Sequence, residues 1–156
     1  LMKKFKDRFW IFGNFAHLSE DCMMHAIKNL NYCVLEYDYK YCKYRSPGKH
    51  IDAEGKCDCQ TSRHGKIVSM FLQQSKALWW MSENQSKSYK KAFPFLKEGR
   101  VLSSVFSDET LDYIQNLDTS NKNDKWIIMN SQSWIKGVDD AVKYAKENGL
   151  EYDSLR

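Results

Sequence analysis

The sequence predicts an α/β fold with a mainly parallel β-sheet and helices on its faces. Short apolar runs rich in β-favouring residues alternate five times with segments whose apolar residues recur at helical spacing. The clearest unit runs from Trp126 to Gly149, where an apolar run is followed by a serine-containing loop and an amphipathic helix. Such alternation is typical of βα units, which place successive strands in parallel.

Each predicted element has its own signal along the chain. Apolar, β-favouring runs place strands at residues 9–12, 32–37, 77–81, 101–103 and 126–129. Helical spacing and serine caps place helices after Ser19, from Gly65, and after Ser82 and Ser107, where Ser82 and Gln85 form a capping box. The last helix carries its apolar residues at positions 138, 141, 142 and 145, and residues 150–152 resemble the start of another strand. Residues 38–64 are polar, aromatic and basic and are expected to form a long loop or an insertion, and long loops in compact domains are usually functional.

Composition limits the class of protein. The chain has 156 residues, 42% of them hydrophobic, and a net charge of +4 that is spread along its length. These values favour a folded chain and imply no nucleic-acid partner. No apolar run approaches the roughly 18 residues of a membrane span, and the first residues lack the apolar segment of a signal peptide. We therefore expect a cytoplasmic protein without a transmembrane segment, whose five cysteines are reduced or bind metal.

The domain organisation follows from a polar segment. Residues 118–125 contain no apolar side chain, so we expect a linker between a first domain, residues 1–117, and a second part, residues 126–156. One strand and one helix cannot bury their apolar faces alone. The second part is therefore expected to be the truncated start of another domain, or to dock onto the first domain.

The loop before the last helix has the features of a phosphate site. A helix that begins at Lys136-Gly137 points free backbone N–H groups towards the strand end, and Lys136 adds a full positive charge. The hydroxyl groups of Ser131 and Ser133 could donate to the same anion. The alternative is that Lys136 is a solvated lysine and that the serines only form the turn.

Three segments carry a resemblance to a known family. Their order resembles that in nucleotide-sugar-dependent group 1 glycosyltransferases of the GT-B fold. The segments are residues 77–85 (ALWWMSENQ), residues 100–106 (RVLSSVF) and the opening of residues 126–145 with its Lys-Gly pair. The resemblance implies a Rossmann-like acceptor-side domain, followed by the first βα unit of a donor-binding domain whose remainder is missing. It covers roughly residues 8–153 in the order of elements.

The resemblance also implies a reaction and its residues. A sugar would pass from a nucleotide diphosphate sugar to a glycan or other acceptor, with no tightly bound cofactor, and Lys136 would neutralise the donor diphosphate together with Ser131, Ser133 and Gly137. The acceptor would contact residues in the loops after the strands, and the catalytic candidates are His17 and Asp38. The acceptor-side candidates are Gly13, Asn14, Glu36, Lys40, Arg45, Ser82 and Glu83. Ser131 stands where the family usually has an arginine, so half of the usual charge clamp is missing or is supplied from elsewhere.

The long loop supports a hypothesis from a different class. Cys57 and Cys59, together with Cys42, His50 and His64, provide enough ligands for zinc in a non-catalytic α/β binding module. Only one residue separates Cys57 from Cys59, whereas paired zinc ligands are usually separated by two to four, so ordinary reduced thiols remain an alternative. Two further alternatives are a Cys42–His50 nucleophilic pair and stacking of single-stranded nucleic acid on the tyrosines of residues 37–45.

Overall fold

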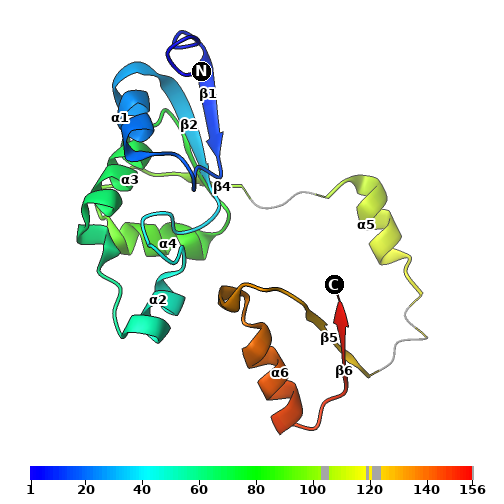
Figure 1. The fold of residues 1–156 in the computed structure, drawn as a ribbon. Coiled ribbons are helices and arrows are strands. Elements are labelled where there is room, and N and C mark those ends of the chain that lie inside the picture. Colours follow the sequence, from blue (N-terminus) through cyan, green and yellow to red (C-terminus); the bar gives the residue numbers. More distant parts are fainter. Residues whose placement is uncertain (103–105, 119, 121–123, 156) are drawn as a thin grey trace. The chain divides into compact units, whose positions relative to one another are not determined.

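A computed structural model describes residues 1–102, 106–118, 120 and 124–155 of the chain. The chain separates into two compact units, residues 1–104 and residues 105–156 (Figure 1). The first unit is a mixed α/β structure with a parallel four-stranded sheet and flanking helices, as the sequence predicts. None of the helices in the described ranges combines the length and apolar composition that a membrane span requires.

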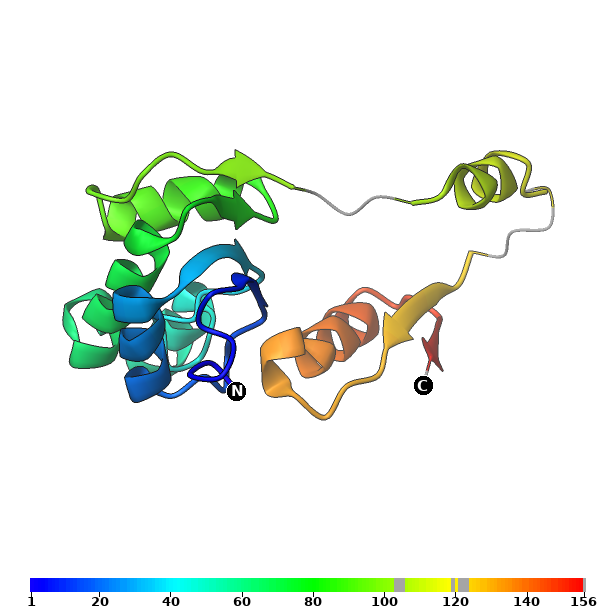
Figure 2. The ribbon, with the colours of Figure 1, turned by 90° about the horizontal axis from the view of Figure 1, so that it is seen from above.

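The sheet of the first unit is parallel throughout, and its strands follow one another in chain order. They are β1 (Phe9–Gly13), β2 (Asn31–Glu36), β3 (Leu78–Trp80) and β4 (Arg100–Val101). Figure 2 shows this succession from the blue β1 to the yellow-green β4. Since the order does not reverse within the described sheet, these four strands contain no topological switch point, the usual ligand crevice of open α/β sheets.

Serine caps position the helices of the first unit. Three of them are α1 (Glu20–Asn29), α3 (Arg63–Gln74) and α4 (Glu83–Ala92), in which the hydroxyl groups of Ser19, Ser62 and Ser82 accept hydrogen bonds from free N–H groups of the first turn. The predicted caps at Ser19 and Ser82 are therefore confirmed, whereas α3 begins two residues before Gly65. The predicted capping box is only half formed, because the Gln85 side chain accepts from the N–H group of Met81 and not from that of Ser82.

The hydrophobic core lies between one face of the sheet and these helices. Phe12, Val34 and Leu78 are register partners, so their side chains share this face. The ring of Phe71 from α3 stacks on Tyr32, with centroids 4.8 Å apart, and the Tyr32 hydroxyl donates to the Phe71 carbonyl oxygen at 2.7 Å. On the opposite face Phe9 and Ile11 are 60% and 67% exposed. The core of this unit is therefore one-sided.

The segment between β2 and α3 is more structured than a loop. It contains the helix α2 (Pro47–Glu54) and the short 3-10 helix η1 (Cys59–Thr61). The prediction of one long loop over residues 38–64 is thus wrong for these stretches. The start and end signals of α2 are present in the sequence: Ser46 caps the helix, Pro47 occupies its first position, and Gly55 ends it with a φ of 77°.

The second unit contains a βαβ arrangement. Its elements are α5 (Asp108–Gln115), β5 (Trp126–Met129), the 3-10 helix η2 (Trp134–Lys136), α6 (Val138–Glu147) and β6 (Tyr152–Leu155). β5 and β6 are parallel, which confirms the strand expected after Gly149. Among the described hydrophobic residues of this unit, only Ile128 and Ala145 are buried. Its core is therefore small.

Part of the predicted linker and of the fourth strand lies outside the described residues. Residues 119 and 121–123 of the expected linker and residues 103–105 after β4 belong to that part. The linker segment falls inside the second unit. The boundary at residues 118–125 and the truncated donor domain stay predictions.

Candidate metal centre

Four potential metal ligands come from the segment between β2 and α3. Cys42 lies in a tight turn in which its N–H group donates to the Tyr39 carbonyl oxygen at 2.8 Å and its own carbonyl oxygen accepts from Arg45 at 2.8 Å. His50 is the only buried residue of α2. Cys57 and Cys59 follow that helix and lead into η1. The four side chains therefore lie around a common centre. They come from the turn, the helix α2 and the stretch that follows it.

The four ligand atoms lie close enough to share one metal ion. All of them are within 4.8 Å of one another. The Sγ atoms of Cys42 and Cys59 each lie 3.4 Å from Nδ1 of His50, and the Sγ atoms of Cys42 and Cys57 are 3.8 Å apart. Tetrahedral zinc with bonds of ~2.3 Å to sulfur and ~2.0 Å to nitrogen separates two sulfurs by ~3.8 Å and sulfur from nitrogen by ~3.5 Å. The three distances in the structure match this spacing.

The chemistry of the ligand set favours zinc. Three cysteine sulfurs and one imidazole suit a borderline-soft dication, whereas calcium and magnesium need oxygen ligands. Four protein ligands leave no open position for a water or a substrate, so the centre has the composition of a structural site. Burial raises the pKa of the Cys57 thiol to about 11, and a dication at the centre would provide the positive charge that a thiolate needs there.

A carboxylate supports the histidine from outside. His50 directs Nδ1 towards the thiols and has Nε2 at 3.0 Å from Oε2 of Glu54, the arrangement that orients metal-binding histidines. Hydrogen bonds from Lys43, Tyr44 and His50 hold the pKa of Glu54 at about 2, well below its ordinary value. Glu54 is therefore ionised over the whole physiological pH range and can accept the Nε2 proton.

His64 does not belong to this cluster. Its Nε2 atom lies 3.0 Å from the carbonyl oxygen of Lys40, and its Nδ1 atom lies 3.5 Å from Oε1 of Glu20 in α1. The structure places His64 outside the group of four ligand atoms: its ring instead connects the segment after β2 to α1. The other four candidate ligands come together as the zinc hypothesis requires.

The burial of Cys42 bears on the nucleophile alternative. Cys42 is 2% exposed, and its Sγ atom faces His50, Cys57 and the interior of the segment. A nucleophile must reach its substrate, and Cys42 has no such access. The geometry of the pair is better explained by metal ligation.

A second group of charges lies where β2 ends. Glu36 is fully buried, its Oε1 atom accepts from Nζ of Lys40 at 3.2 Å, and Lys40 also lies 3.8 Å from Asp38. Burial raises the pKa of Glu36 to about 7, although Lys40 and the nearby backbone N–H groups lower it. Arg45 pairs with Asp38 at 3.4 Å from the exposed side. Glu36 and Lys40 therefore act inside the protein, whereas Asp38 and Arg45 are accessible.

The other acceptor-side candidates lie in the loops after β1 and β3. Gly13 ends β1 and Asn14 follows it with a φ of 43°, while His17 is exposed in the same loop. Ser82 caps α4, and the exposed Glu83 pairs with Lys87 at 3.8 Å. Because β1 and β3 are parallel to β2, these loops leave the same edge of the sheet as Glu36. Contact of any of them with an acceptor stays a prediction.

The four phosphate-site candidates lie in the second unit. Ser131 accepts the N–H group of Ser133 at 3.2 Å, which is the role of a turn former. Lys136 ends η2, and Gly137 begins α6 in the left-handed conformation, with a φ of 71° and no side-chain cap. Glycine has no side chain that could cap the first N–H groups of α6, and a phosphate site requires such uncapped groups. Anion binding there stays a prediction.

Comparison with known proteins gives no family for this chain. No family model matches it, and no curated protein sequence is significantly similar to it. The functional argument therefore depends on the geometry of the chain itself.

The metal centre could have been predicted more firmly from the sequence. The pair Cys57 and Cys59 is separated by one residue, and this unusual spacing argues against a zinc site. The stronger signal is the short helix predicted by Ser46, Pro47 and Gly55, because it folds the chain back between Cys42 and Cys57. The hydrogen bond from His50 to Glu54 is an i, i+4 contact on this helix.

Proposed function

We propose that residues 1–104 form a zinc-stabilised α/β binding domain, in which a Cys₃His centre holds the segment between β2 and α3 in a fixed shape. The observation that carries this proposal is the group of four ligand atoms, from Cys42, His50, Cys57 and Cys59, within 4.8 Å of one another. The metal has a structural role, since all four positions of a tetrahedral ion are taken by the protein.

The helix α2 needs such a device because it buries no apolar residue of its own. α2 has eight residues, and isolated helices of this length are unstable in water. Its only buried residue is His50, so the one buried side chain that ties α2 to the rest of the segment is a proposed zinc ligand. Zinc binding would therefore contribute directly to the folding free energy of this segment.

Zinc content and local protection test this proposal together. The wild-type chain and the Cys42→Ser and Cys22→Ser variants are purified, equilibrated with a small excess of zinc, desalted, and analysed for metal. We expect one zinc ion per chain in the wild type and in Cys22→Ser, whose thiol lies in α1 outside the cluster, and none in Cys42→Ser. Hydrogen exchange should show lost protection in residues 46–62 of Cys42→Ser. Stoichiometric zinc in Cys42→Ser would exclude this centre.

A second candidate function is transfer of a sugar from a nucleotide-sugar donor by a GT-B glycosyltransferase. It is favoured by one observation in the second unit: the parallel β5–α6–β6 arrangement begins its helix at Lys136-Gly137, with Gly137 in the left-handed conformation. In this proposal the first unit is the Rossmann-like acceptor-side half, and Lys136 neutralises the donor diphosphate. A structural zinc centre is compatible with this role, so metal analysis alone does not separate the two.

Nucleotide binding tests the second candidate. The chain is titrated with uridine, guanosine and adenosine diphosphates and with their sugar conjugates, and heat of binding is measured. We expect Lys136→Ala to weaken binding about tenfold, which is the effect of one lost charge-assisted contact. Lys143→Ala is the matched control, since Lys143 lies further along α6 and pairs with Glu147 at 3.8 Å. Equal affinity of wild type and Lys136→Ala would contradict the assignment.

A further inference from the structure

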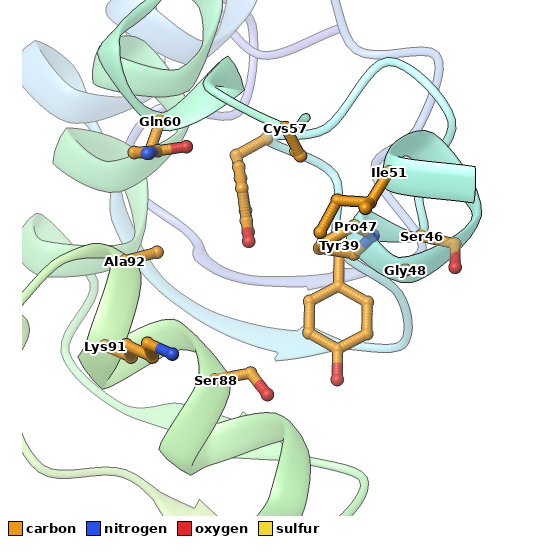
Figure 3. A pocket seen from close by; sticks show the side chains of 11 residues that line it. Tyr39, Ser46, Pro47, Gly48, Ile51, Cys57, Gln60, Ser88, Lys91 and Ala92 are labelled. Atoms are coloured by element: carbon orange, nitrogen blue, oxygen red, sulfur yellow. The ribbon is translucent and has the colours of Figure 1, made fainter. Parts of the chain in front are cut away.

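The zinc-held segment forms one wall of a pocket in the first unit. The pocket has a volume of about 550 Å³ and lies between α2, the stretch around Cys57 and the helix α4. Figure 3 shows Ser88 and Lys91 of α4 on one side and Pro47 and Ile51 of α2 on the other. Its size falls in the range of small-molecule sites, roughly 300–1,000 Å³.

The pocket is formed only when the segment after β2 is in place. Cys57, a candidate zinc ligand, lines it directly, and Ser46 and Ile51 belong to the cap and body of α2, which His50 fixes to the same centre. α4, by contrast, is held to the core by Tyr89, whose ring packs on Trp80 with centroids 4.8 Å apart. One wall therefore depends on the metal centre, and the other depends on the hydrophobic core.

Aromatic rings give the pocket rigid apolar surface. Tyr39 stacks on Tyr89 with centroids 5.7 Å apart and ring planes 10° apart, and Tyr41 meets Tyr89 and Phe93 edge to face at 5.2 Å and 5.1 Å. Tyr41 is 5% exposed. Tyr41 therefore supports the wall from behind, and the half-buried Tyr39 is the ring that can meet the C–H face of a small ring compound, while neighbouring hydroxyl and amide groups suit its hydroxyl groups. Those polar groups come from Ser46, Gln60 and Ser88.

The charge of the pocket is positive. Lys91 is its one cationic lining residue, and no lining residue carries a carboxylate. Within the described parts of the chain Lys91 forms no ion pair, whereas Lys87 and Lys90 of the same helix pair with Glu83 and Glu98. Lys91 is exposed at this pocket, and an ammonium group that is not paired with a carboxylate favours an anionic ligand.

We propose that this pocket binds a small hydroxylated ring compound that carries one carboxylate or phosphate group, with Lys91 at the anionic group and the Tyr39 ring against the ring face. The proposal rests on the proposed function, because the zinc-held segment supplies half of the site. The volume accommodates one ring and one anionic group, and the neutral lining residues supply hydrogen bonds without competing for the charge.

Isothermal titration of the zinc-equilibrated full chain tests the proposal. The probes are glucuronate and ribose 5-phosphate, and glucose and inorganic phosphate serve as the uncharged and ring-free controls. The variants are Lys91→Gln, Lys87→Gln and Ala92→Trp, and the zinc content of every sample is measured separately. Lys87→Gln is the matched control because Lys87 lies one turn before Lys91 on α4 and does not line the pocket.

We expect at least one of the two anionic ring compounds to bind more tightly than both controls, with Lys91→Gln weakening it at least tenfold, Lys87→Gln leaving it unchanged, and Ala92→Trp abolishing it. A zinc-loaded chain that binds neither ring compound would overturn the pocket proposal and leave the metal centre standing. Equal binding of inorganic phosphate would overturn it as well. A chain that contains no zinc but binds a probe through Lys91 would uphold the pocket and contradict the proposed metal centre.

Discussion

Nε2 of His50 lies 3.0 Å from Oε2 of Glu54, while Nδ1 of the same ring lies 3.4 Å from the Sγ atoms of Cys42 and Cys59. One ring nitrogen is thus committed to a carboxylate and the other to the thiols. A proton on Nε2, donated to Glu54, leaves the lone pair of Nδ1 available for a metal ion. The contact fixes both the tautomer and the orientation of the ring.

Glu54→Gln should weaken zinc binding while the fold is retained. The substitution removes the negative charge that accepts the Nε2 proton, and loss of such a supporting carboxylate typically lowers metal affinity about 10- to 100-fold. Competition with a chromophoric chelator measures the affinity. Asp52→Asn is the control, because Asp52 lies on the same helix but pairs with Lys49 at 3.8 Å and is exposed. The same affinity for Glu54→Gln and Asp52→Asn would show that Glu54 does not support the metal.

Gly65→Ala should destabilise the junction between η1 and α3. A Cβ atom at position 65 would collide with the backbone carbonyl group of Cys59, which has no room to move because Cys59 is a candidate ligand. We expect the free energy of unfolding in urea to fall by about 1–3 kcal/mol, the usual effect of overpacking. Gly48→Ala is the matched control, since nothing lies within 4 Å of its added Cβ atom, and its effect should stay within about 0.5 kcal/mol. Equal unfolding curves for the two variants would contradict this packing.

Glu36 should make the stability of the protein fall as the pH rises. Burial raises its pKa to about 7 from an ordinary value of 4.5, so the folded state keeps a proton that the unfolded state has already lost. The stabilisation is complete below the unfolded pKa and is lost as the pH rises through the folded pKa. Between pH 6 and pH 8 the loss amounts to about 1.4 kcal/mol for one such group.

The test of this pH dependence compares urea unfolding of the wild type and Glu36→Gln at pH 6, 7 and 8. Glu36→Gln removes the titrating group. Lys40 is present in both proteins, so their difference reports the titration of Glu36. As the pH rises from 6 to 8, the unfolding free energy of the wild type should fall relative to that of Glu36→Gln. A difference that stays constant over this range, with a carboxyl titration of Glu36 near its ordinary pKa by carbon NMR, would show that Glu36 is ionised in the folded protein.

The order of strands and helices could be predicted from the sequence because its signals are local. Ser19, Ser82 and Ser107 cap helices as expected, and the apolar run at residues 126–129 is a strand. The helix α2 could have been predicted as well from Ser46 and Gly55. Which strands pair, and that the described core occupies one face of the sheet, depends on contacts between distant residues, which local patterns do not contain.

The candidate site was harder to predict, since its members meet only in space. Cys42 and Cys59 are seventeen positions apart in the sequence, and their Sγ atoms come to the same imidazole because α2 reverses the chain between them. His64 fits the composition of a ligand equally well, but its ring bonds to Lys40 and Glu20 instead. The sequence could indicate five candidate ligands. Only the fold shows which four of them lie close together.

X-ray absorption at the zinc edge tests the central claim most directly. The full chain is equilibrated with zinc, desalted and measured in frozen solution. The proposed centre predicts one zinc ion per chain with three sulfur neighbours at ~2.3 Å and one nitrogen neighbour at ~2.0 Å. A chain that retains no zinc, or a zinc ion surrounded only by oxygen and nitrogen atoms, would contradict the assignment of Cys42, His50, Cys57 and Cys59 as its ligands.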